Sequence, residues 1–378
     1  MDTDDVLVRA HGRAPLPTWN HGRKLKFIAF VPPWPPKQKI RVHSCSSVAK
    51  SIPLSGIHRI LVIRRDNIGD LICTTPLIRA LRKRFPQARL DVLVNDYNAA
   101  VVTGNPDIDH VIAYTKAKHA DTPKWPALWR EWRVYRQLRR RRYDLLIHAN
   151  PVNHPRTDKL ARYLKPRHAL GVSDSDTGVY DLRLRPQDIR GTHHVERVFS
   201  LLAPLGIEGE PGPLFVPGKH RRKPQTPPVL GIHISSRRPR NRWPLDRFAE
   251  VIRNRLAQGW RCRLFWAPGP GDDPRHPGDD EHARTLLSDF PTELEPMPTR
   301  RLEDLIQGLA DTDQILCCDG GALHLAAGLG RPTVALFGCT DPKRWGPWGV
   351  PNRSLDGHGD AGNIPASQAI AALEELHP

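Results

Sequence analysis

The stretch of sequence that decides the fold is R-I-L-V-I-R-R-D-N-I-G-D-L-I-C-T-T-P-L-I-R-A-L, residues Arg59–Leu81. Ile60–Ile63 is a short apolar run rich in β-branched residues, typical of a strand buried on both faces of a parallel sheet. A polar turn follows, and from Asp70 onward apolar residues return at helical spacing, with Pro76 in a position that only a helix start tolerates. In an open α/β sheet such a turn lies at the carboxyl end of the strand, where ligands bind, so Asp70 is expected to project into a crevice.

A carboxylate in the position of Asp70 has two interpretations. Aspartate is common at a helix N-terminus, where its side chain accepts hydrogen bonds from free backbone N–H groups. It can also serve as a general base when a turn holds it in a crevice. The residues of this stretch alone favour the cap, because Asp caps are frequent.

Length and charge limit the class of protein. The chain has 378 residues, a formal net charge of +17 and a pI near 10.0. The length predicts two or three domains, each with its own core. The charge predicts attraction to polyanions, which include nucleic acid, anionic membranes and phosphorylated substrates. No zinc-finger, helix-turn-helix or RNP-type motif accompanies the arginines, so nucleic acid is not an expected partner. A GC-rich genome would also produce high Arg and Pro usage.

Composition divides the chain into four parts. Residues 1–56 are basic and rich in proline, and are expected to form a largely disordered N-terminal extension. Alternating predicted strands and helices then define a first domain at residues 57–208. Residues 209–228 contain six prolines and are predicted to be a linker. A second α/β domain is expected at residues 229–378.

The N-terminus and the hydropathy indicate a cytoplasmic location. Residues 1–5 carry three aspartates where an export signal would carry positive charge. No apolar run reaches the length of about 18 residues that a membrane span needs. We therefore expect the chain to stay in the cytosol, with peripheral contact to the inner face of the cytoplasmic membrane as an option.

Apolar runs predict further buried strands, and periodic segments predict helices. The strands are expected at Leu90–Val94, Val111–Tyr114, Asp144–His148, Val229–Ile234, Arg263–Trp266, Gln314–Cys318 and Thr333–Phe337. The helices are expected at residues 127–142, 193–205, 243–256, 281–287, 302–310 and 322–329, and residues 171–185 are expected to be loop-rich. Parallel βα repeats of this kind predict two doubly wound sheets in tandem with a cleft between them.

The predicted helix at residues 127–142 is unusually basic. Trp129 and Trp132 lie on one side of it, and arginines crowd the remainder. Tryptophans on a helix most often face a core, which would leave the arginines as a solvated face. A helix with this pattern can alternatively lie on an anionic membrane surface.

A second informative stretch, at residues 317–342, is C-C-D-G-G-A-L-H-L-A-A-G-L-G-R-P-T-V-A-L-F-G-C-T-D-P. Asp319 ends a strand, and Gly320 and Gly321 let the backbone approach a ligand closely. The following helix offers free N–H groups at the positive end of its dipole, an arrangement suited to a phosphate or diphosphate. For His324, about one turn into the helix, a core position is the default.

A second strand exit follows on the same edge of the predicted sheet. Its loop could bring Thr340 and Asp341 to the same ligand. Neither the lysine of a P-loop nor the G-x-G-x-x-G spacing is present, so neither motif applies.

Together the two stretches resemble glycosyltransferase family 9, the ADP-heptose:lipopolysaccharide heptosyltransferases. The matching segments are R-R-D-N-I-G-D-L-I-C-T-T-P at residues 64–76 and D-G-G-A-L-H-L-A-A-G-L-G-R-P-T-V-A-L-F-G-C-T-D-P at residues 319–342. The R-W-P of Arg242–Pro244 is similar to the family's K-x-W-P element. The resemblance covers about residues 58 to 350, in the family's order.

This resemblance implies a GT-B fold, in which two Rossmann-like domains with doubly wound parallel sheets face a central cleft. It implies that Asp70 is the catalytic base, which reverses the preference for a helix cap. The donor-binding residues that it implies are Arg240, Arg242, Glu281, Asp319, Gly320, Gly321, His324, Thr340 and Asp341. The implied acceptor-side residues are Asn67, Gly69, Thr74, His148 and Asn150.

Two positions depart from the family pattern. Gly320 stands where the family has serine or threonine, which removes a hydroxyl group that could meet a phosphate. Asn241 stands where the family has the lysine two positions before W-P. The cation that neutralises a diphosphate must then come from Arg237, Arg238, Arg240 or Arg242.

The expected reaction is an inverting transfer of a heptose or related sugar, with ADP-heptose as the favoured donor, to a hydroxyl group of a lipopolysaccharide-core type acceptor. The acceptor would be lipid-linked or phosphorylated, presented at an anionic membrane surface. No cofactor is expected, and because no Asp-x-Asp motif stands in the expected site, the transfer is predicted to be metal-independent. Alternatives are another nucleotide sugar for O-antigen, capsule or a glycoprotein glycan, and a nucleotide-binding module without catalysis.

Overall fold

A computed structural model of the chain describes residues 55–115, 124–153, 155–176, 178–218, 224–272 and 278–376. All of them belong to one structural unit. Apart from residues 55 and 56, the predicted N-terminal extension lies outside the described residues, and the predicted linker is described only in part. The predicted domain boundaries stay predictions.

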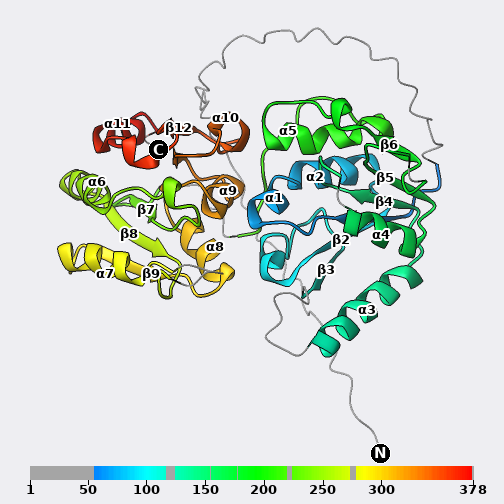
Figure 1. Ribbon diagram of the computed structural model, residues 1–378. Helices are drawn as coiled ribbons and strands as arrows, with labels where there is room; N and C mark the ends of the chain where they lie inside the picture. The colour runs from blue at the N-terminus through cyan, green and yellow to red at the C-terminus, as the bar shows by residue number, and fades with distance from the viewer. Residues whose placement is uncertain are drawn as a thin grey trace, which may run out of the picture. The chain divides into compact units, whose positions relative to one another are not determined.

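The first lobe is built on a six-stranded parallel sheet (Figure 1). Its strands are β1 (Arg59–Ile63), β2 (Arg89–Asn95), β3 (His110–Tyr114), β4 (Leu145–His148), β5 (His168–Val172) and β6 (Leu182–Leu184), in the order β3-β2-β1-β4-β5-β6. Its α-helices are α1 (Ile68–Ile72), α2 (Thr75–Arg84), α3 (Lys124–Arg140), α4 (Pro155–Leu164) and α5 (His194–Phe199). Three short 3₁₀ turns complete it, η1 (Asp96–Val101), η2 (Pro186–Asp188) and η3 (Ser200–Leu205).

The second lobe repeats this architecture with a second six-stranded parallel sheet. Its strands are β7 (Val229–His233), β8 (Arg261–Trp266), β9 (Leu294–Pro298), β10 (Gln314–Cys318), β11 (Thr333–Phe337) and β12 (Asn352–Asp356), in the order β12-β11-β10-β7-β8-β9. Its α-helices are α6 (Leu245–Ala257), α7 (Asp280–Asp289), α8 (Leu302–Ala310), α9 (Gly321–Gly328), α10 (Pro342–Trp345) and α11 (Ala366–Glu375). Its 3₁₀ turns are η4 (Pro239–Asn241) and η5 (Ala361–Asn363).

Both sheets follow the same doubly wound order. Numbered within its own lobe, each runs 3-2-1-4-5-6, so the chain reverses direction across the sheet between the first and fourth strands. Those switch points lie between β1 and β4 and between β7 and β10, where Ile63 pairs with His148 and Cys317 with His233. Ligands of such sheets bind beyond the carboxyl ends of the strands at the switch point. Asp70 follows β1 and Asp319 follows β10, so the topology places one candidate carboxylate at each switch point.

The sequence predicts most of the inner strands and, of the four edge strands, only β3. Each predicted strand is present, its ends shifted by two residues at most. The expectation of a loop-rich segment at residues 171–185 is confirmed for most of its described residues, although β5 ends at Val172 and β6 (Leu182–Leu184) lies within it. The strands not predicted are the inner strand β5 and the edge strands β6, β9 and β12. An edge strand needs no long apolar run and tolerates proline, as the two prolines of β9 (L-E-P-M-P) illustrate.

Two helical predictions also change. The single helix expected after Asp70 is divided into α1 and α2 at Cys73 and Thr74, because Pro76 has no N–H with which to continue α1. The expectation that the tryptophans of α3 face a core is wrong. Trp129 is 59% exposed and Trp132 is 46% exposed, whereas Leu138 of the same helix is buried.

The two lobes meet through α1 and α9. A side chain at Gly321 would lie in contact with Ile68, and the amide of Val216 donates to the carbonyl of Gly328 at 2.8 Å. One cluster of buried apolar side chains includes Ile72 of the first lobe and Leu325 of the second. The turn after β1 therefore lies directly against the helix that follows β10. Within the part of the chain that is described, no helix is both long and apolar enough to cross a bilayer.

Candidate functional site

Asp70 lies at the third position of α1, with its two carboxylate oxygens in different environments. Oδ2 accepts hydrogen bonds from the backbone and the side chain of Asn67, at 3.3 and 3.0 Å. Oδ1 accepts from Arg64 Nη2 at 2.7 Å and lies 3.2 Å from His194 Nε2. Asn67 is the N-cap, so Asp70 completes the first turn of α1 without being the cap residue itself. Asp70 thus supports the start of α1 with one oxygen and contacts Arg64 and His194 with the other.

The surroundings keep Asp70 ionised. Burial alone would raise the pKa of this carboxyl, but the hydrogen bond with His194 and the charge of Arg64 outweigh burial and hold the pKa well below its usual range. The carboxyl group of Asp70 is therefore already deprotonated near neutral pH. It is an oriented anion in a protein environment from which most water is excluded.

Arg64 ties the two strands of the first switch point together. It follows β1, it is 1% exposed, and its Nη1 donates to the carbonyl of Ala149, just after β4. Its Nε lies 3.2 Å from Asp66 Oδ2. The sequence analysis did not select Arg64. The available signal was an arginine that directly follows an apolar strand, where a buried charge requires a partner.

His194 brings the start of α5 to Asp70. Its ring is buried, and Nε2 lies 3.1 Å from Arg64 Nη2. Trp345, from α10 of the second lobe, stacks on the ring with a centroid distance of 4.4 Å. Burial lowers the pKa of His194, against the opposing effect of Asp70. The sequence analysis missed this residue, since only the fold brings residue 194 to residue 70.

The neighbouring His193 has a structural role. Its Nδ1 accepts from the amide of Val195 at 3.1 Å, and its Nε2 donates to the carbonyl of Gly346 at 2.9 Å. These two bonds assign the proton to Nε2 and link α5 of the first lobe to the segment after α10. Burial lowers the pKa of His193, which favours this neutral form.

The predicted acceptor-side residues divide between direct contact and support. Asn67 contacts Asp70 and is exposed. Thr74 is buried and donates to the main-chain oxygen of Asp70 at 2.9 Å, so it supports the α1 turn. Asn150 donates to Asp66 at 3.0 Å, one step further from Asp70. His148 is buried, and its Nδ1 lies 3.2 Å from the hydroxyl of Tyr180.

Gly69 and His324 pack closely against each other across the two lobes. A Cβ atom on Gly69 would lie 2.5 Å from Cδ2 of the His324 ring, so only glycine leaves space there. His324 Nδ1 lies 3.7 Å from the sulfur of Cys73. Burial lowers the pKa of His324 to about 3, so the ring is neutral. His324, predicted by resemblance to bind the donor, is buried against the Asp70 turn.

In the second lobe, Asp319, Asn241 and Thr340 form one hydrogen-bonded cluster. Oδ2 of Asp319 accepts from Asn241 Nδ2 at 2.9 Å and from Thr340 Oγ1 at 2.7 Å. Asn241 Oδ1 in turn accepts from the amides of Gly338 and Cys339 at 3.2 and 2.9 Å. A single amide side chain therefore connects the loops that follow β7, β10 and β11. Burial raises the pKa of Asp319, whereas the hydrogen bond from Thr340 and the charge of Arg238 oppose it.

The cluster explains what Asn241 does in place of the lysine that the family pattern has at this position. Asn241 is 1% exposed and uses both ends of its amide within the protein. The side chain at this position thus organises three loops and presents no charge to a ligand. A cation for a bound diphosphate has to come from neighbouring residues.

The arginines beside this cluster differ in how far the protein itself engages or buries their side chains. Arg242 donates to Asp279 Oδ1 at 2.5 Å and to the carbonyl of Ser236 at 3.0 Å, so it is already paired. Arg237, Arg238 and Arg240 are exposed. These three side chains are therefore the better candidates for contact with a diphosphate, and Arg242 supports the loop.

The remaining predicted donor residues lie around the same edge of the second sheet. Gly320 is the N-cap of α9 and Gly321 its first residue. Asp341 is the N-cap of α10, where its carboxylate accepts from the amide of Lys343 at 2.9 Å. Glu281, at the start of α7, is exposed. No metal-binding group of three or more His, Cys, Asp or Glu side chains occurs among the described residues.

This chain is similar to known sugar-transferring proteins in sequence and in structure. A family model described as glycosyltransferase family 9 (heptosyltransferase) matches residues 131–361. Lipopolysaccharide heptosyltransferase 3 of Escherichia coli K12 is 27% identical over 82% of this chain and 95% of its own length. A glycosyltransferase family 9 structure from Veillonella parvula superposes with a TM-score of 0.70 at 21% identity, covering 84% of this chain and 97% of that one. The E. coli heptosyltransferase WaaC with ADP gives a TM-score of 0.67 at 20% identity, covering 84% and 100%.

Proposed function

The chain belongs to glycosyltransferase family 9, the heptosyltransferases, and on that premise we propose that it transfers a heptose or a closely related sugar from a nucleoside diphosphate to an acceptor hydroxyl. It is a glycosyltransferase with the two-lobed GT-B fold. The observation that carries the proposal is Asp70, an ionised and oriented carboxylate at the first switch point, against which the second lobe brings Trp345 and His324.

Asp70 is the proposed general base. It would accept the proton of the acceptor hydroxyl while the oxygen attacks the anomeric carbon from the face opposite the departing diphosphate, which inverts the configuration. A carboxylate with so low a pKa is a weak base, so proton transfer would accompany the formation of the C–O bond, when the hydroxyl becomes acidic. A positioned base typically contributes about 10²- to 10⁴-fold in rate.

The second lobe would stabilise the departing diphosphate. Charge grows on this group in the transition state, and fixed cations and backbone N–H groups lower the energy of that charge without reorganising. The exposed Arg237, Arg238 and Arg240 and the N–H groups at the start of α9 are suited to this. The Asp319–Asn241–Thr340 cluster would fix the positions of the three loops relative to one another.

We favour ADP-heptose as the donor and a lipopolysaccharide-core acceptor. The support comes from relatives: one is named for lipopolysaccharide and heptose, and another was solved with ADP. The net charge of +17 suits a phosphorylated acceptor at the inner face of the cytoplasmic membrane. We propose that location for the reaction.

A transfer assay with a panel of radiolabelled nucleotide sugars and a lipopolysaccharide-core acceptor tests the proposal. The native protein should transfer heptose from ADP-heptose with inversion. Asp70→Asn should lose about 10²- to 10⁴-fold in turnover and keep its donor affinity, because it keeps the shape of the side chain. Asp289→Asn, which changes an exposed carboxylate at the end of α7, is the matched control.

Three outcomes would revise the proposal. Near-normal turnover of Asp70→Asn would show that the residue only completes α1. Transfer from a different nucleotide sugar would keep the reaction class and replace the donor. Stabilisation by nucleotides without transfer of any sugar in the panel would indicate a binding module.

A further inference from the structure

The outer face of α3 carries exposed aromatic and basic side chains together. Trp129 and Trp132 are two of the four large hydrophobic side chains that are strongly exposed among the described residues. At 100° per residue they share a helix face with Arg133, Arg136 and Arg140, whereas Leu138 lies on the opposite, buried face. An exposed tryptophan pair needs an explanation, because tryptophan burial usually contributes strongly to stability.

The two indole rings are held in place by their own neighbours. Their centroids lie 5.9 Å apart, with the planes tilted by 43°. The guanidinium of Arg133 lies over the ring of Trp129 at 5.5 Å, and that of Arg136 lies over the ring of Trp132 at 5.2 Å. One face of each ring is thus already covered by a cation.

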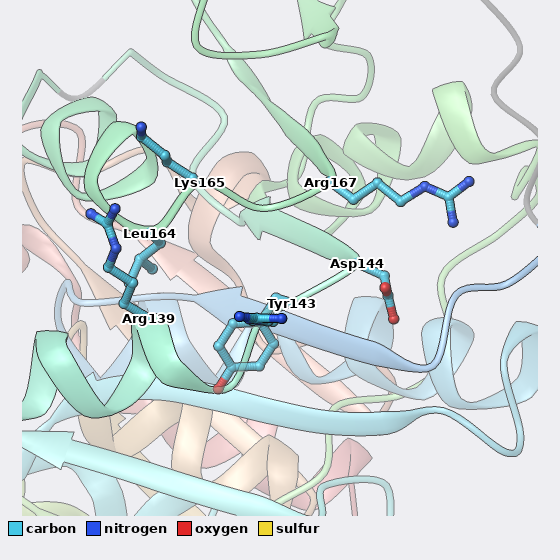
Figure 2. A pocket seen from close by; sticks show the side chains of 7 residues that line it. Arg139, Tyr143, Asp144, Leu164, Lys165 and Arg167 are labelled. Carbon is cyan, nitrogen blue, oxygen red and sulfur yellow. The ribbon is translucent and has the colours of Figure 1, made fainter.

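A basic pocket of about 490 Å³ opens beyond the end of α3 (Figure 2). Figure 2 shows Arg139 and Lys165 on one side of it, and Asp144 and Arg167 on the other. Its full lining is Arg139, Arg142, Tyr143, Asp144, Leu164, Lys165 and Arg167. Four cationic side chains therefore border the pocket, against one carboxylate.

Arg139 is engaged within the protein, since it donates to the carbonyl of Tyr163 at 2.7 Å and lies over the Tyr163 ring. The charges that remain at the border of the pocket are those of Arg142, Lys165 and Arg167. Asp144 is committed to the protein, since its Oδ2 accepts from the amides of His58 and Arg59 at 2.8 and 2.9 Å. Arg142 and Lys165 are held with φ of 47° and 48°, in the left-handed region that non-glycine residues rarely adopt. Both residues come just after a helix, α3 or α4, and a left-handed residue is a common way to end a helix.

The pocket adjoins the C-terminal end of the helix that carries the tryptophans. Asp144 and Arg167 directly precede β4 and β5, so the pocket lies at the amino ends of the strands, opposite the Asp70 edge. Helix α3 follows β3 and precedes β4, so it runs from the carboxyl edge of the sheet back to the amino edge. Its 17 residues span about 25 Å at 1.5 Å per residue. The outer face of α3 thus connects the edge that holds the candidate site with the basic pocket.

We propose that the α3 surface, made of Trp129, Trp132, Arg136, Arg142, Lys165 and Arg167, docks the protein on an anionic phospholipid bilayer. The indoles occupy the interface between headgroups and acyl chains, where tryptophan is favoured, and the pocket takes a lipid phosphate. The arginines and the lysine supply attraction to the anionic leaflet. This inference does not depend on which sugar the enzyme transfers.

The same features argue against single-stranded nucleic acid as the occupant. Nucleic acid binding of that kind needs ring faces that are free to stack bases, along a basic groove. Here each indole has one face covered by an arginine, and both lie on the outside of a helix. A bilayer requires no stacking and accepts a convex surface.

Sedimentation of the full chain with vesicles tests the proposal. The vesicles contain phosphatidylcholine alone or mixed with phosphatidylglycerol, and salt is varied. At low salt, the loss of each charge should lower the affinity for mixed vesicles about fivefold. The triple variant R142Q/K165Q/R167Q should therefore lose about a hundredfold in affinity. That difference should shrink as salt screens it. W129A/W132A should weaken binding at low and high salt alike, because its contribution is apolar.

A matched control separates this surface from net charge. K83Q/R284Q/R300Q removes the same charge at exposed positions elsewhere in both lobes and should retain most of the vesicle affinity. Equal losses in the control and the α3 variants would overturn the proposal. So would α3 variants that bind vesicles normally yet lose affinity for nucleic acid. Tight binding of free glycerol phosphate that survives without vesicles would instead assign the pocket to a small anion.

Discussion

Two carboxylates, one in each lobe, have pKa values displaced in opposite directions. Burial tends to raise both, but at Asp70 the hydrogen bond with His194 and the charge of Arg64 outweigh it, so the pKa falls. Asp319 meets mainly neutral donors, and burial prevails, so its pKa rises. The residue proposed to take a proton is therefore the one that the protein keeps ionised, and Asp319 serves as a hydrogen-bond acceptor for Asn241 and Thr340.

The pH dependence of turnover should depend on His194 and not on Asp70. Protonated His194 adds a second cation beside Asp70, after Arg64, which makes the carboxylate a still weaker base. The nearby Arg344 disfavours this protonation and lowers the pKa of His194 further. Because burial lowers the pKa of His194 below its ordinary value, the loss of turnover should begin at a pH below about 6.5. A profile of kcat against pH measures this.

His194→Gln should flatten that acid limb, since glutamine can donate to Asp70 but cannot gain a proton. Turnover at neutral pH should fall less in this variant than in His194→Ala, which removes the donor. An acid limb that is unchanged in His194→Gln would assign the titration to another group.

At the scale of elements, the packing of α1 on α9 decides how the two switch points meet. The contact is tight because a glycine of α1 lies directly under a histidine ring of α9. Short helices such as α1 have little stability of their own, so this packing is what holds Asp70 in place. A change at the contact should therefore affect both stability and turnover.

Gly69→Ala tests this contact. A helical glycine changed to alanine gains about 1 kcal/mol from propensity, but the new Cβ would lie 2.5 Å from the buried ring of His324. Overpacking of that kind costs about 1–3 kcal/mol, so we expect a lower free energy of unfolding, measured with denaturant, and a lower turnover. Gly212→Ala is the control, because its Cβ would meet no atom within 4 Å. Equal stability of the two variants would mean that the lobes can separate freely.

At the scale of the whole molecule, we propose that fixed positive charge takes the role that a metal ion has in many sugar transferases. A formal net charge of +17 places many fixed cations on the chain. The exposed Arg237, Arg238 and Arg240 lie on the loop after β7, beside the Asp319 cluster. Fixed cations can stabilise a leaving diphosphate without a divalent ion.

Transfer should accordingly continue in excess EDTA at an unchanged rate. A magnesium-dependent kinase in the same buffer verifies that free divalent ions have been removed. Loss of transfer in EDTA that Mg²⁺ or Mn²⁺ restores would show that a metal ion takes part. The same assay with Arg237, Arg238 and Arg240 each changed to glutamine identifies the cation that matters most.

The amino-acid sequence by itself determined the α/β class, most of the inner strands and the position of Asp70 after β1. Those features depend on local patterns: apolar runs make buried strands, and a polar turn before a periodic segment starts a helix. The edge strands β6, β9 and β12 were not predicted, because a strand with one neighbour needs little apolar surface. The inner strand β5 was also not predicted, and this reason does not apply to it.

Only the tertiary structure decided what surrounds Asp70. Arg64 and His194 meet at 3.1 Å although 130 residues separate them in the chain. Asn241 connects three strand exits, and Trp129 and Trp132 face outward. None of this follows from local pattern, since the partner of a buried polar group and the face that a helix buries depend on what the rest of the chain packs against it.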